Sequence, residues 1–447
     1  MKTNILYIIT LLLLGGSQSV YAQKKALALK DALEMAKHGN KALQAQVLEE
    51  IHAQEMTREA KGGLLPSISA NAAYSRYFER PIIFLPGSFA GTDKAVQDVA
   101  FGGKNAFDVF VSLHQPILAP TIQQLKEGSK INEQLADQKT ADLKSRVALQ
   151  VSTRYLDILM MDRQLGLLEQ SLKRNVKALE DARSLLTQGR GLKSDTLRSF
   201  VAVENLRSSV SYLKNRMEVS SMELKRLIGL DEPIDIVLTD QLEIGNSQGE
   251  FYQVEEALQI AEQNRNDLHV QQLAIDYQQN KLKVAQAGLL PELSLIGQYQ
   301  VQAQADNLKF SQYALPRTSF LGLRLSVPIF NGNRTKSQIS QARIKARQEE
   351  IRLSDLKDEV KTELATIISK WKEAVTQLGI QETTVKSAEL NHQIIDDRFK
   401  NGLGSRLELT DAELALTQAK INYLNAVYNL RMLHVSLQHA LGLLRLS

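Results

Sequence analysis

The alternation of apolar and polar residues changes its period several times along this chain. Four short runs alternate with a period of two, at 67–75, 107–114, 293–302 and 321–327. Alternation of this kind predicts strands with one apolar face, and a tilted strand of about 10 residues is long enough to cross a bilayer. A half-buried strand of a soluble protein shows the same alternation, so one run alone does not decide between the two.

If the strands cross a bilayer, the apolar positions of the alternating runs face lipid. These positions include Val109, Val111, Leu113, Leu293, Leu295, Leu321, Leu323 and Leu325. The opposite face, which carries Gln298, Gln300 and Gln302, is expected to be polar and uncharged.

Helical periodicity fills most of the remaining sequence. Shorter helices are predicted at 29–38 and 41–61, and much longer ones at 121–188 and 334–400. At 1.5 Å per residue, each long helix would extend about 100 Å, far beyond the helices of ordinary globular proteins. Gly189 and Gly402 interrupt these helices, and another long helix follows each glycine.

The helices that follow the two glycines carry apolar residues every seven positions. Such a seam predicts helices that pack side by side, as in coiled coils. The first seam contains Val203, Leu206, Val210, Leu213, Met217, Leu224 and Leu227, and the second contains Leu416, Ala419, Tyr423, Ala426, Leu430, Leu437 and Ala440.

These features occur twice because the sequence contains an internal repeat. Gly63-Leu64-Leu65-Pro66 recurs as Gly288-Leu289-Leu290-Pro291, and matched residues continue on both sides of the motif. A duplication on this scale indicates two copies of one supersecondary unit. We therefore expect a first repeat at 23–228, a connecting segment at 229–253 and a second repeat at 254–447.

The N-terminal 22 residues have the features of a secretory signal peptide. Lys2 is followed by a short apolar run and by Val20-Tyr21-Ala22, a small-residue cleavage pattern. An uncleaved N-terminal anchor is the competing reading. The chain has no cysteine, which excludes disulfides and thiolate metal sites, and its formal net charge of +4 argues against a nucleic-acid partner.

Hydrogen bonding constrains how the predicted strands can sit in a membrane. Membrane barrels contain at least about eight strands, and an open sheet edge in lipid leaves unpaired amides that each cost several kcal/mol. One chain supplies only four strands, so several identical chains would have to share one barrel. Two chains would give eight strands and three would give twelve; the sequence alone leaves both possible.

The ordered set of motifs resembles the TolC family of outer-membrane efflux and secretion channels. The two Gly-Leu-Leu-Pro motifs precede strands, and Val327-Pro328-Ile329-Phe330-Asn331-Gly332 leads back into a helix. Phe399-Lys400-Asn401-Gly402 with Leu407-Glu408-Leu409-Thr410-Asp411-Ala412 resembles the helix-turn-helix of the family's periplasmic tip. The resemblance covers nearly the whole chain after the signal peptide.

This resemblance implies a mainly α-helical fold that contributes strands to a transmembrane β-barrel, assembled as a homotrimer with twelve strands. It also implies a helical tunnel through the periplasm, whose tip docks onto a periplasmic adaptor attached to an inner-membrane pump. Residues 78–104 and 303–317 would form the outward loops, and 231–251 would form a belt around the tunnel.

The resemblance also suggests functional residues at the tip. Glu408 and Asp411, with Asp195 as the counterpart in the first repeat, would form an acidic ring at the periplasmic entrance; acids in the first turn of a helix are also common without such a role. The tip turns would contain Gly189, Arg190, Gly191, Asn401, Gly402 and Gly404, and dock the adaptor or simply cap the helices.

The tip departs from the family pattern at two positions. Phe399 stands where a tyrosine is typical, and Gly404 stands where an arginine locks the closed tip. Arg190, Arg398 or Arg406 could replace that arginine.

No catalytic constellation, cofactor motif or metal-ligand cluster is recognisable, so we expect a passive duct rather than an enzyme. A periplasmic coiled-coil adaptor or scaffold is the alternative, but it would not need four amphipathic strands. The sequence does not decide between drug efflux, metal export and type I protein secretion, because the pump selects the cargo.

Overall fold

The computed structural model describes residues 24–230, 234–242, 252–309 and 313–446. The predicted signal peptide lies outside these residues. The chain divides into two compact units. Unit 1 comprises residues 1–48, 138–270 and 354–447, and unit 2 comprises residues 49–137 and 271–353.

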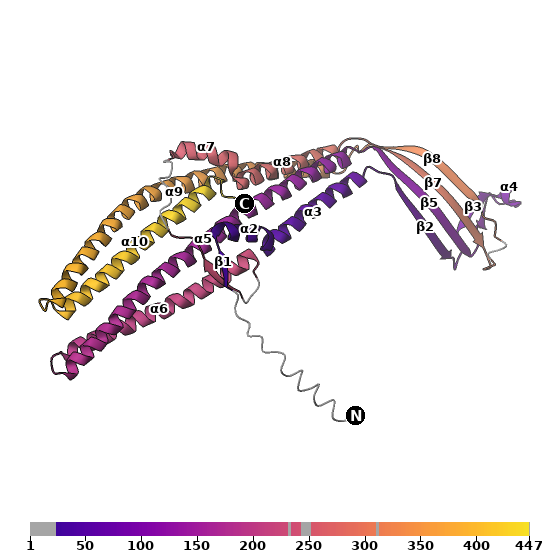
Figure 1. The fold of residues 1–447 in the computed structure, drawn as a ribbon. Coiled ribbons are helices and arrows are strands. Elements are labelled where there is room, and N and C mark those ends of the chain that lie inside the picture. Colours follow the sequence, from indigo (N-terminus) through magenta and orange to yellow (C-terminus); the bar gives the residue numbers. More distant parts are fainter. Residues whose placement is uncertain (1–23, 231–233, 243–251, 310–312, 447) are drawn as a thin grey trace, which may run out of the picture. The chain divides into compact units, whose positions relative to one another are not determined.

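Unit 2 contains a four-stranded antiparallel sheet in the order β2-β5-β7-β8 (Figure 1). Its strands are β2 (Ser67–Arg76), β5 (Asn105–Leu118), β7 (Glu292–Ala305) and β8 (Arg317–Ser326). All four alternating runs of the sequence are therefore strands, and the two repeats meet where β5 pairs with β7.

One strand boundary differs from the prediction. The alternating run 107–114 is followed by Pro116, where the sequence predicts that the strand stops, yet β5 continues to Leu118. The register of β5 on β7 shifts between Pro116 and Leu118, as at a bulge. Ile117 is the residue without a counterpart in this register, and proline is tolerated in strands next to such irregularities.

The connection between β2 and β5 contains elements that periodicity did not predict. Strands β3 (Ile82–Pro86) and β4 (Val96–Ala100) pair as a separate antiparallel hairpin, joined through the short helix α4 (Gly87–Ala90). The connection between β7 and β8 spans only 306–316, of which 310–312 lie outside the described residues.

Unit 1 is built mainly from long helices. The first repeat supplies α2 (Leu29–Gly39), α3 (Lys41–Gly62), α5 (Pro120–Thr187) and α6 (Lys193–Ile228). The second supplies α7 (Val254–Asn264), α8 (Asn266–Ala287), α9 (Arg334–Lys400) and α10 (Arg406–Ala440). The boundary between the two units falls within α3, α5, α8 and α9. Corresponding helices have nearly equal lengths, for example 68 residues in α5 and 67 in α9.

The predicted heptad seams lie at buried positions of α6 and α10. In α6, Val203, Leu206, Val210, Leu213, Leu224 and Leu227 are buried, and Met217 packs against the same core partly exposed. In α10, Ala419, Ala426, Leu430, Leu437 and Ala440 are buried, whereas Leu416 and Tyr423 are half-buried. Among the described residues, no helix is both long and apolar enough to cross a membrane.

A small parallel sheet links the start of the described chain to the predicted belt. Strand β1 (Lys24–Leu27) pairs with β6 (Asp235–Leu238), and the Tyr155 hydroxyl donates to the Leu27 carbonyl at 2.9 Å. The Asp240 carboxylate accepts the backbone N–H of Leu29 at 2.8 Å, at the start of α2. The rest of the belt, at 231–233 and 243–251, lies outside the described residues.

Each repeat has a corner where a short helix turns into the next one, and the two corners use different chemistry. At the α2–α3 corner, Asn40 Nδ2 donates to the Leu227 carbonyl at 2.9 Å. Asn40 Oδ1 accepts the backbone N–H groups of Ala42 and Leu43 at 3.0 and 3.2 Å. One neutral amide thus satisfies both the end of α6 and the start of α3.

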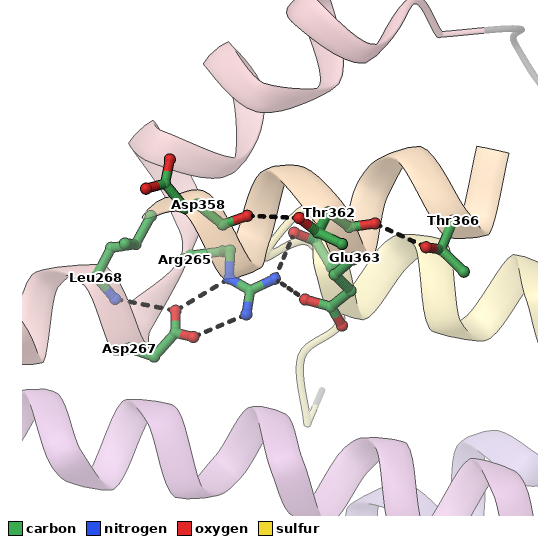
Figure 2. Close-up of polar contacts among 8 residues, drawn as sticks. Arg265, Asp267, Leu268, Asp358, Thr362, Glu363 and Thr366 are labelled. Atoms are coloured by element: carbon green, nitrogen blue, oxygen red, sulfur yellow. Dashed lines mark hydrogen bonds and ion pairs between the residues drawn. The ribbon is translucent and has the colours of Figure 1, made fainter. Parts of the chain in front are cut away.

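At the α7–α8 corner, a charged cluster takes the place of this amide (Figure 2). Arg265 Nη1 donates to Glu363 Oε2 at 2.6 Å and to the Ala440 carbonyl at 3.2 Å. Its Nε and Nη2 donate to the two carboxylate oxygens of Asp267 at 3.1 and 2.8 Å. Asp267 Oδ1 in turn accepts the backbone N–H of Leu268 at 2.9 Å. The cluster joins the corner to α9 and to the end of α10.

Candidate functional sites

The sheet of unit 2 has one apolar face. The eight residues predicted to face lipid all lie on it, because the register sets Leu293 opposite Leu325 and Leu295 opposite Leu323. The same register sets Val109 and Val111 opposite Val301 and Tyr299. Leu321, Leu323 and Leu325 of β8 are 64–70% exposed in the single chain. This surface has the composition of a lipid-facing wall.

Aromatic rings gather on the apolar face near the end of the sheet that carries the long β2–β5 connection. The rings of Tyr74 and Phe107 are 4.8 Å apart between centroids, and those of Phe107 and Tyr313 are 5.9 Å apart. Tyr74 Oη also donates to Asn105 Oδ1 at 2.9 Å. Amphipathic aromatic side chains at this level are typical of a membrane–water interface.

The opposite face of the sheet is polar but, contrary to expectation, not uncharged. Gln298 Nε2 donates to Gln300 Oε1 at 3.1 Å, and Gln300 Nε2 donates to Asp108 Oδ1 at 2.6 Å. Arg324 lies on the same face, opposite Ser294. The prediction of an uncharged face is therefore wrong. Asp108 and Arg324 occupy polar positions of their own alternating runs, and the pairing of β5 and β8 with β7 puts both charges on the face of the glutamines.

The two outer strands of the sheet each have one partner within the described chain. β2 pairs only with β5, and β8 pairs only with β7. Their outer edges therefore present backbone groups for pairing with another chain.

In unit 1, the predicted tip turns are helix-capping turns with the same geometry. Gly189 and Gly402 have positive φ angles of 70° and 74°. The N–H groups of Gly189 and Arg190 donate to the carbonyls of Leu186 and Leu185, and those of Gly402 and Leu403 donate to the carbonyls of Phe399 and Arg398. This pairing is the Schellman motif, in which the residue directly after the C-cap is left-handed, a conformation that favours glycine.

The remaining tip positions contribute close backbone packing. A methyl group at Gly191 would lie 2.9 Å from the backbone nitrogen of Leu186, and one at Gly404 would lie 3.1 Å from that of Phe399. Asn401 Nδ2 donates to the Asp397 carbonyl at 2.8 Å, and Arg190 is exposed. The residues predicted to dock the adaptor thus have a structural role in the two turns, and adaptor docking stays a prediction.

One arginine contacts both tip hairpins. Arg406, at the start of α10, places its guanidinium 5.2 Å from the ring centroid of Phe399 and 3.9 Å from Asp181 Oδ2 on α5. With Asp195, these residues line a cavity of about 390 Å³ between the two hairpins. Arg398, by contrast, donates to the Leu403 carbonyl of its own turn. Phe399 therefore supports a cation–π contact where a hydroxyl was expected.

The predicted entrance acids lie at the starts of the second long helices. Glu408 and Asp411 are both exposed, and Asp195 is half-buried. Glu408 also forms a capping box: its Oε2 accepts the Ser405 N–H at 3.1 Å, and Ser405 Oγ accepts the Glu408 N–H at 3.2 Å. The structure therefore gives Glu408 a local role besides any role in an acidic ring.

Two groups of residues were not singled out from the sequence. Asp181 carries no signal of its own, because its contact with Arg406 joins segments more than 200 residues apart. Arg265, Asp267 and Glu363 were also missed. The repeat contained a signal for them, because it aligns each of these charged residues with an uncharged one. Arg265 aligns with Asn40 and Asp267 with Ala42. Glu363 aligns with Gln150, at the same spacing that relates Gly402 to Gly189.

Comparison with known proteins finds matches among outer-membrane efflux and secretion proteins. The family model described as outer membrane efflux protein matches residues 257–443. The chain is 22% identical over 449 residues to the proteases secretion protein PrtF of Dickeya chrysanthemi, covering 96% of this chain and 91% of that protein. These matches agree with the TolC-like resemblance read from the sequence, and the family model falls within the second repeat.

Further matches are to proteins of the same kind. The alkaline protease secretion protein AprF of Pseudomonas aeruginosa is 21% identical, over 91% of this chain and 84% of that protein. The Campylobacter jejuni CmeC outer membrane channel superposes with a TM-score of 0.75 at 16% identity, over 94% of this chain and 86% of that one. The predicted TolC-like fold class is confirmed, with its internal duplication and four strands per chain.

The relatives also bear on the broad function. They are outer-membrane efflux and secretion proteins, in agreement with the predicted outer-membrane channel and not with the periplasmic adaptor.

Proposed function

We propose that three copies of this chain form one passive export duct, with a twelve-stranded barrel in the outer membrane and a helical tunnel in the periplasm. The sheet of unit 2 carries the proposal. It has one apolar face, and each of its edge strands, β2 and β8, pairs on one side only within the described chain. In lipid these edges need partners. Pairing of β8 with β2 of the next copy closes a barrel, and the family resemblance selects three copies rather than two.

Matched arginine substitutions on the two faces of β8 test the orientation of the sheet. L323R places a charge on the apolar face, where an arginine near the bilayer midplane costs about 2–4 kcal/mol. T318R is the control, because Thr318 lies on the polar face of the same strand. We expect L323R to abolish outer-membrane assembly and T318R to preserve it. Equal assembly of the two variants would contradict the proposed barrel.

The number of subunits is tested on the intact protein. Native mass spectrometry of the detergent-solubilised channel should give the mass of three chains, and carbonate washing should leave the protein in the membrane pellet. A monomer, or release by carbonate, would overturn the proposal.

For the periplasmic entrance we propose that Glu408 and Asp411 of each copy line the opening, with Asp195 beside them. Both lie exposed in the first turns of α10. Rings of carboxylates favour cations in a pore. E408Q combined with D411N should lower the cation preference in single-channel recordings. D355N combined with E382Q, at exposed positions of α9, removes the same two charges elsewhere and serves as the control. Unchanged selectivity would remove the acidic ring from the proposal.

We propose that the Arg406 contact with Asp181 and Phe399 holds the two tip hairpins of one chain together in the resting state. R406A should raise the channel's open probability, whereas R398A should not, because Arg398 bonds only its own turn. Docking of a periplasmic adaptor onto the two glycine turns would then act next to this contact. Equal conductance of R406A and the unaltered channel would argue against this role.

The cargo follows from the pump that the adaptor recruits. Two relatives that match most of the chain are named as protease secretion proteins, which favours a polypeptide cargo and a type I secretion system. Deleting the gene should remove one or more proteins from the culture supernatant. An unchanged set of secreted proteins, with increased drug sensitivity, would instead favour small-molecule efflux.

A further inference from the structure

The connection between β2 and β5 carries an apolar surface that nothing else in the described chain covers. Strands β3 and β4 form a ribbon of five residue pairs outside the main sheet. Phe84 of β3 is 71% exposed, and Phe89 of α4 is 83% exposed. An isolated two-stranded ribbon is marginally stable in water, so this hairpin needs a partner surface.

Few charges protect this hairpin from association. Between 81 and 101 the charged residues are Asp93, Lys94 and Asp98. The apolar residues Ile82, Ile83, Leu85, Val96 and Val99 are distributed over both faces of the ribbon, according to its pairing. The second repeat has a much shorter connection at this position, so the fold itself does not require the hairpin.

The base of the hairpin is fixed to the end of β7. Arg80 Nη2 lies 2.8 Å from Asp306 Oδ1, and Arg80 Nη1 donates to the Gly102 carbonyl at 3.3 Å. The backbone N–H of Lys104 donates to Asp306 Oδ1 at 3.1 Å. These bonds determine where the hairpin leaves the sheet.

The same bonds show which face of the sheet the hairpin base crosses. Gln304 alternates with Gln302 and Gln300 and therefore lies on the polar face. Its Oε1 accepts the N–H of Gly103 at 3.3 Å, and a methyl group at Gly102, which has a φ of 81°, would lie 1.9 Å from that oxygen. The backbone at 102–103 is thus packed against a side chain of the polar face. In the proposed barrel, that face lines the lumen.

The size of such a barrel identifies the partner. Twelve strands about 4.8 Å apart and tilted by about 40° enclose a barrel with a backbone radius of about 12 Å. A five-residue strand extends about 16 Å, so a hairpin that starts at the wall is long enough to reach the axis. Three hairpins would then meet each other.

We propose that the β3–β4 hairpins of the three subunits pack together through Phe84 and Phe89 and close the outer mouth of the channel. This inference rests on the proposed trimeric barrel. The partner of each hairpin is the same hairpin of another copy, and burial of the aromatic rings supplies the stabilisation.

The absence of cysteine from the sequence allows a direct crosslinking test. We expect F84C to give a covalent dimer of the chain when outer membranes are treated with a short bis-maleimide. L308C is the matched control: Leu308 is 54% exposed and lies three residues beyond the end of β7, about 10 Å of extended chain, so it falls short of the axis. L308C should stay monomeric on a denaturing gel.

A second measurement examines the seal itself, independently of the periplasmic tip. Ser112 lies on the polar face, so S112C can be labelled from outside intact cells with a polyethylene glycol maleimide. Replacing residues 82–100 by a short Gly-Ser linker should raise the labelling rate several-fold, and F84S with F89S should raise it less. A small maleimide should label S112C at a similar rate in all these proteins.

The outcomes separate this inference from the proposal on which it rests. If native mass spectrometry gives a trimer but F84C and F89C both fail to crosslink, the hairpins do not meet and the inference is wrong, while the channel proposal stands. Quenching of a fluorophore on F84C by brominated lipids would also overturn it, because the hairpin would then lie in the membrane. If the chain is not trimeric, both proposals fail.

Discussion

The two helix corners of unit 1 solve the same packing problem with different side chains. At the α2–α3 corner, the Asn40 amide bonds the end of α6 and the start of α3. At the α7–α8 corner, Arg265 bonds the end of α10, and Asp267 bonds the start of α8. In the first repeat, one neutral residue, Asn40, makes both hydrogen bonds. In the second repeat, the charged residues Arg265 and Asp267 each make one of them.

This division adds a connection that the first corner lacks. The Arg265 side chain is only 10% exposed, and it also binds Glu363 on α9. Burial alone would lower the pKa of Arg265, but the hydrogen bonds and charges of Asp267 and Glu363 raise it above its ordinary value. The second corner is therefore tied to one of the long helices by charge. The comparison indicates that two repeats can keep the same backbone corner while the stability of the corner comes to depend on charge and pH in only one of them.

The largest effect is expected from R265A. Removing one member of a buried ion cluster leaves its partners uncompensated and typically costs 3–5 kcal/mol; because Asp267 and Glu363 are partly exposed, we expect about 3 kcal/mol here. Amide hydrogen exchange of the assembled channel should show faster local opening at the start of α8 and no change at the start of α3.

A variant that copies the first repeat serves as the control for R265A. R265N, D267A and E363Q together recreate the Asn40, Ala42 and Gln150 arrangement. Since asparagine can both donate to the Ala440 carbonyl and accept the Leu268 N–H, we expect most of the protection to return. If the triple variant opens as readily as R265A, the two corners are not equivalent and the comparison fails.

A smaller effect is expected from N40A. It leaves the Leu227 carbonyl and the N–H groups of Ala42 and Leu43 without their amide partner, which should cost about 1–2 kcal/mol. The measurement is again hydrogen exchange, now at the start of α3. N40D tests the mechanism, because aspartate retains the acceptor but loses the donor to Leu227. If N40A reduces hydrogen-exchange protection as much as R265A does, the Asn40 corner contributes as much stability as the charged corner.

Acid should affect only the charged corner. Burial lowers the pKa of His439, and the Arg265 charge lowers it further, although Glu363, Asp267 and Asp142 oppose this. The folded state therefore favours neutral His439, so its contribution to stability is complete above the unfolded pKa of about 6.5 and declines as the pH falls below it. Hydrogen exchange, corrected for intrinsic rates, should accelerate at the α7–α8 corner between about pH 7 and pH 5 and not at the α2–α3 corner.

The same measurement in H439Q separates this effect from carboxylate titration. Burial opposes ionisation of Asp267, but the hydrogen bond and charge of Arg265 keep its pKa below the ordinary value of 3.8. Its stabilisation is thus present above about pH 3.8 and declines only in stronger acid. H439Q should abolish the change between pH 7 and pH 5; its persistence would point to His434, whose pKa burial also lowers.

The smallest effect concerns the starts of the second long helices. Ser405 caps α10 through its side chain, whereas Leu192 precedes α6 without a side-chain cap. L192S supplies a hydroxyl three residues before Asp195 and should stabilise the first turn of α6 by about 0.5–1 kcal/mol, while S405A should destabilise α10 by about 1 kcal/mol. Local hydrogen exchange at both helix starts measures the two changes. No gain in L192S would show that turn geometry, not the missing hydroxyl, limits α6.

Much of the fold was predictable because the period of apolar residues along the sequence indicates which face of a strand or helix is apolar. Alternation at 67–75 and 321–327 located edge strands β2 and β8, and proline-free helical stretches located α5 and α9 almost to the residue. The β3–β4 hairpin was missed, because its strands are short and apolar on both faces and so have no clear period. Pro116 ended the predicted strand too early, because a bulge is a property of the pairing and is invisible in one strand.

The candidate sites divide in the same way. Gly189 and Gly402 could be recognised as turn residues, since a left-handed position selects glycine locally. The contact of Arg406 with Asp181 could not, because it depends on two hairpins from different repeats lying next to each other.

The sequence by itself determined the repeat, the long helices, the four amphipathic strands and the need for further copies, because each follows from local period and from backbone hydrogen bonding. Tertiary structure alone decided which charges meet. Arg265 acts with Glu363, Arg406 with Asp181, and Arg80 with Asp306 through distances that depend on packing between remote segments. The physical reason is that a buried or bridging charge is stabilised by its spatial partner, and sequence spacing does not encode that partner.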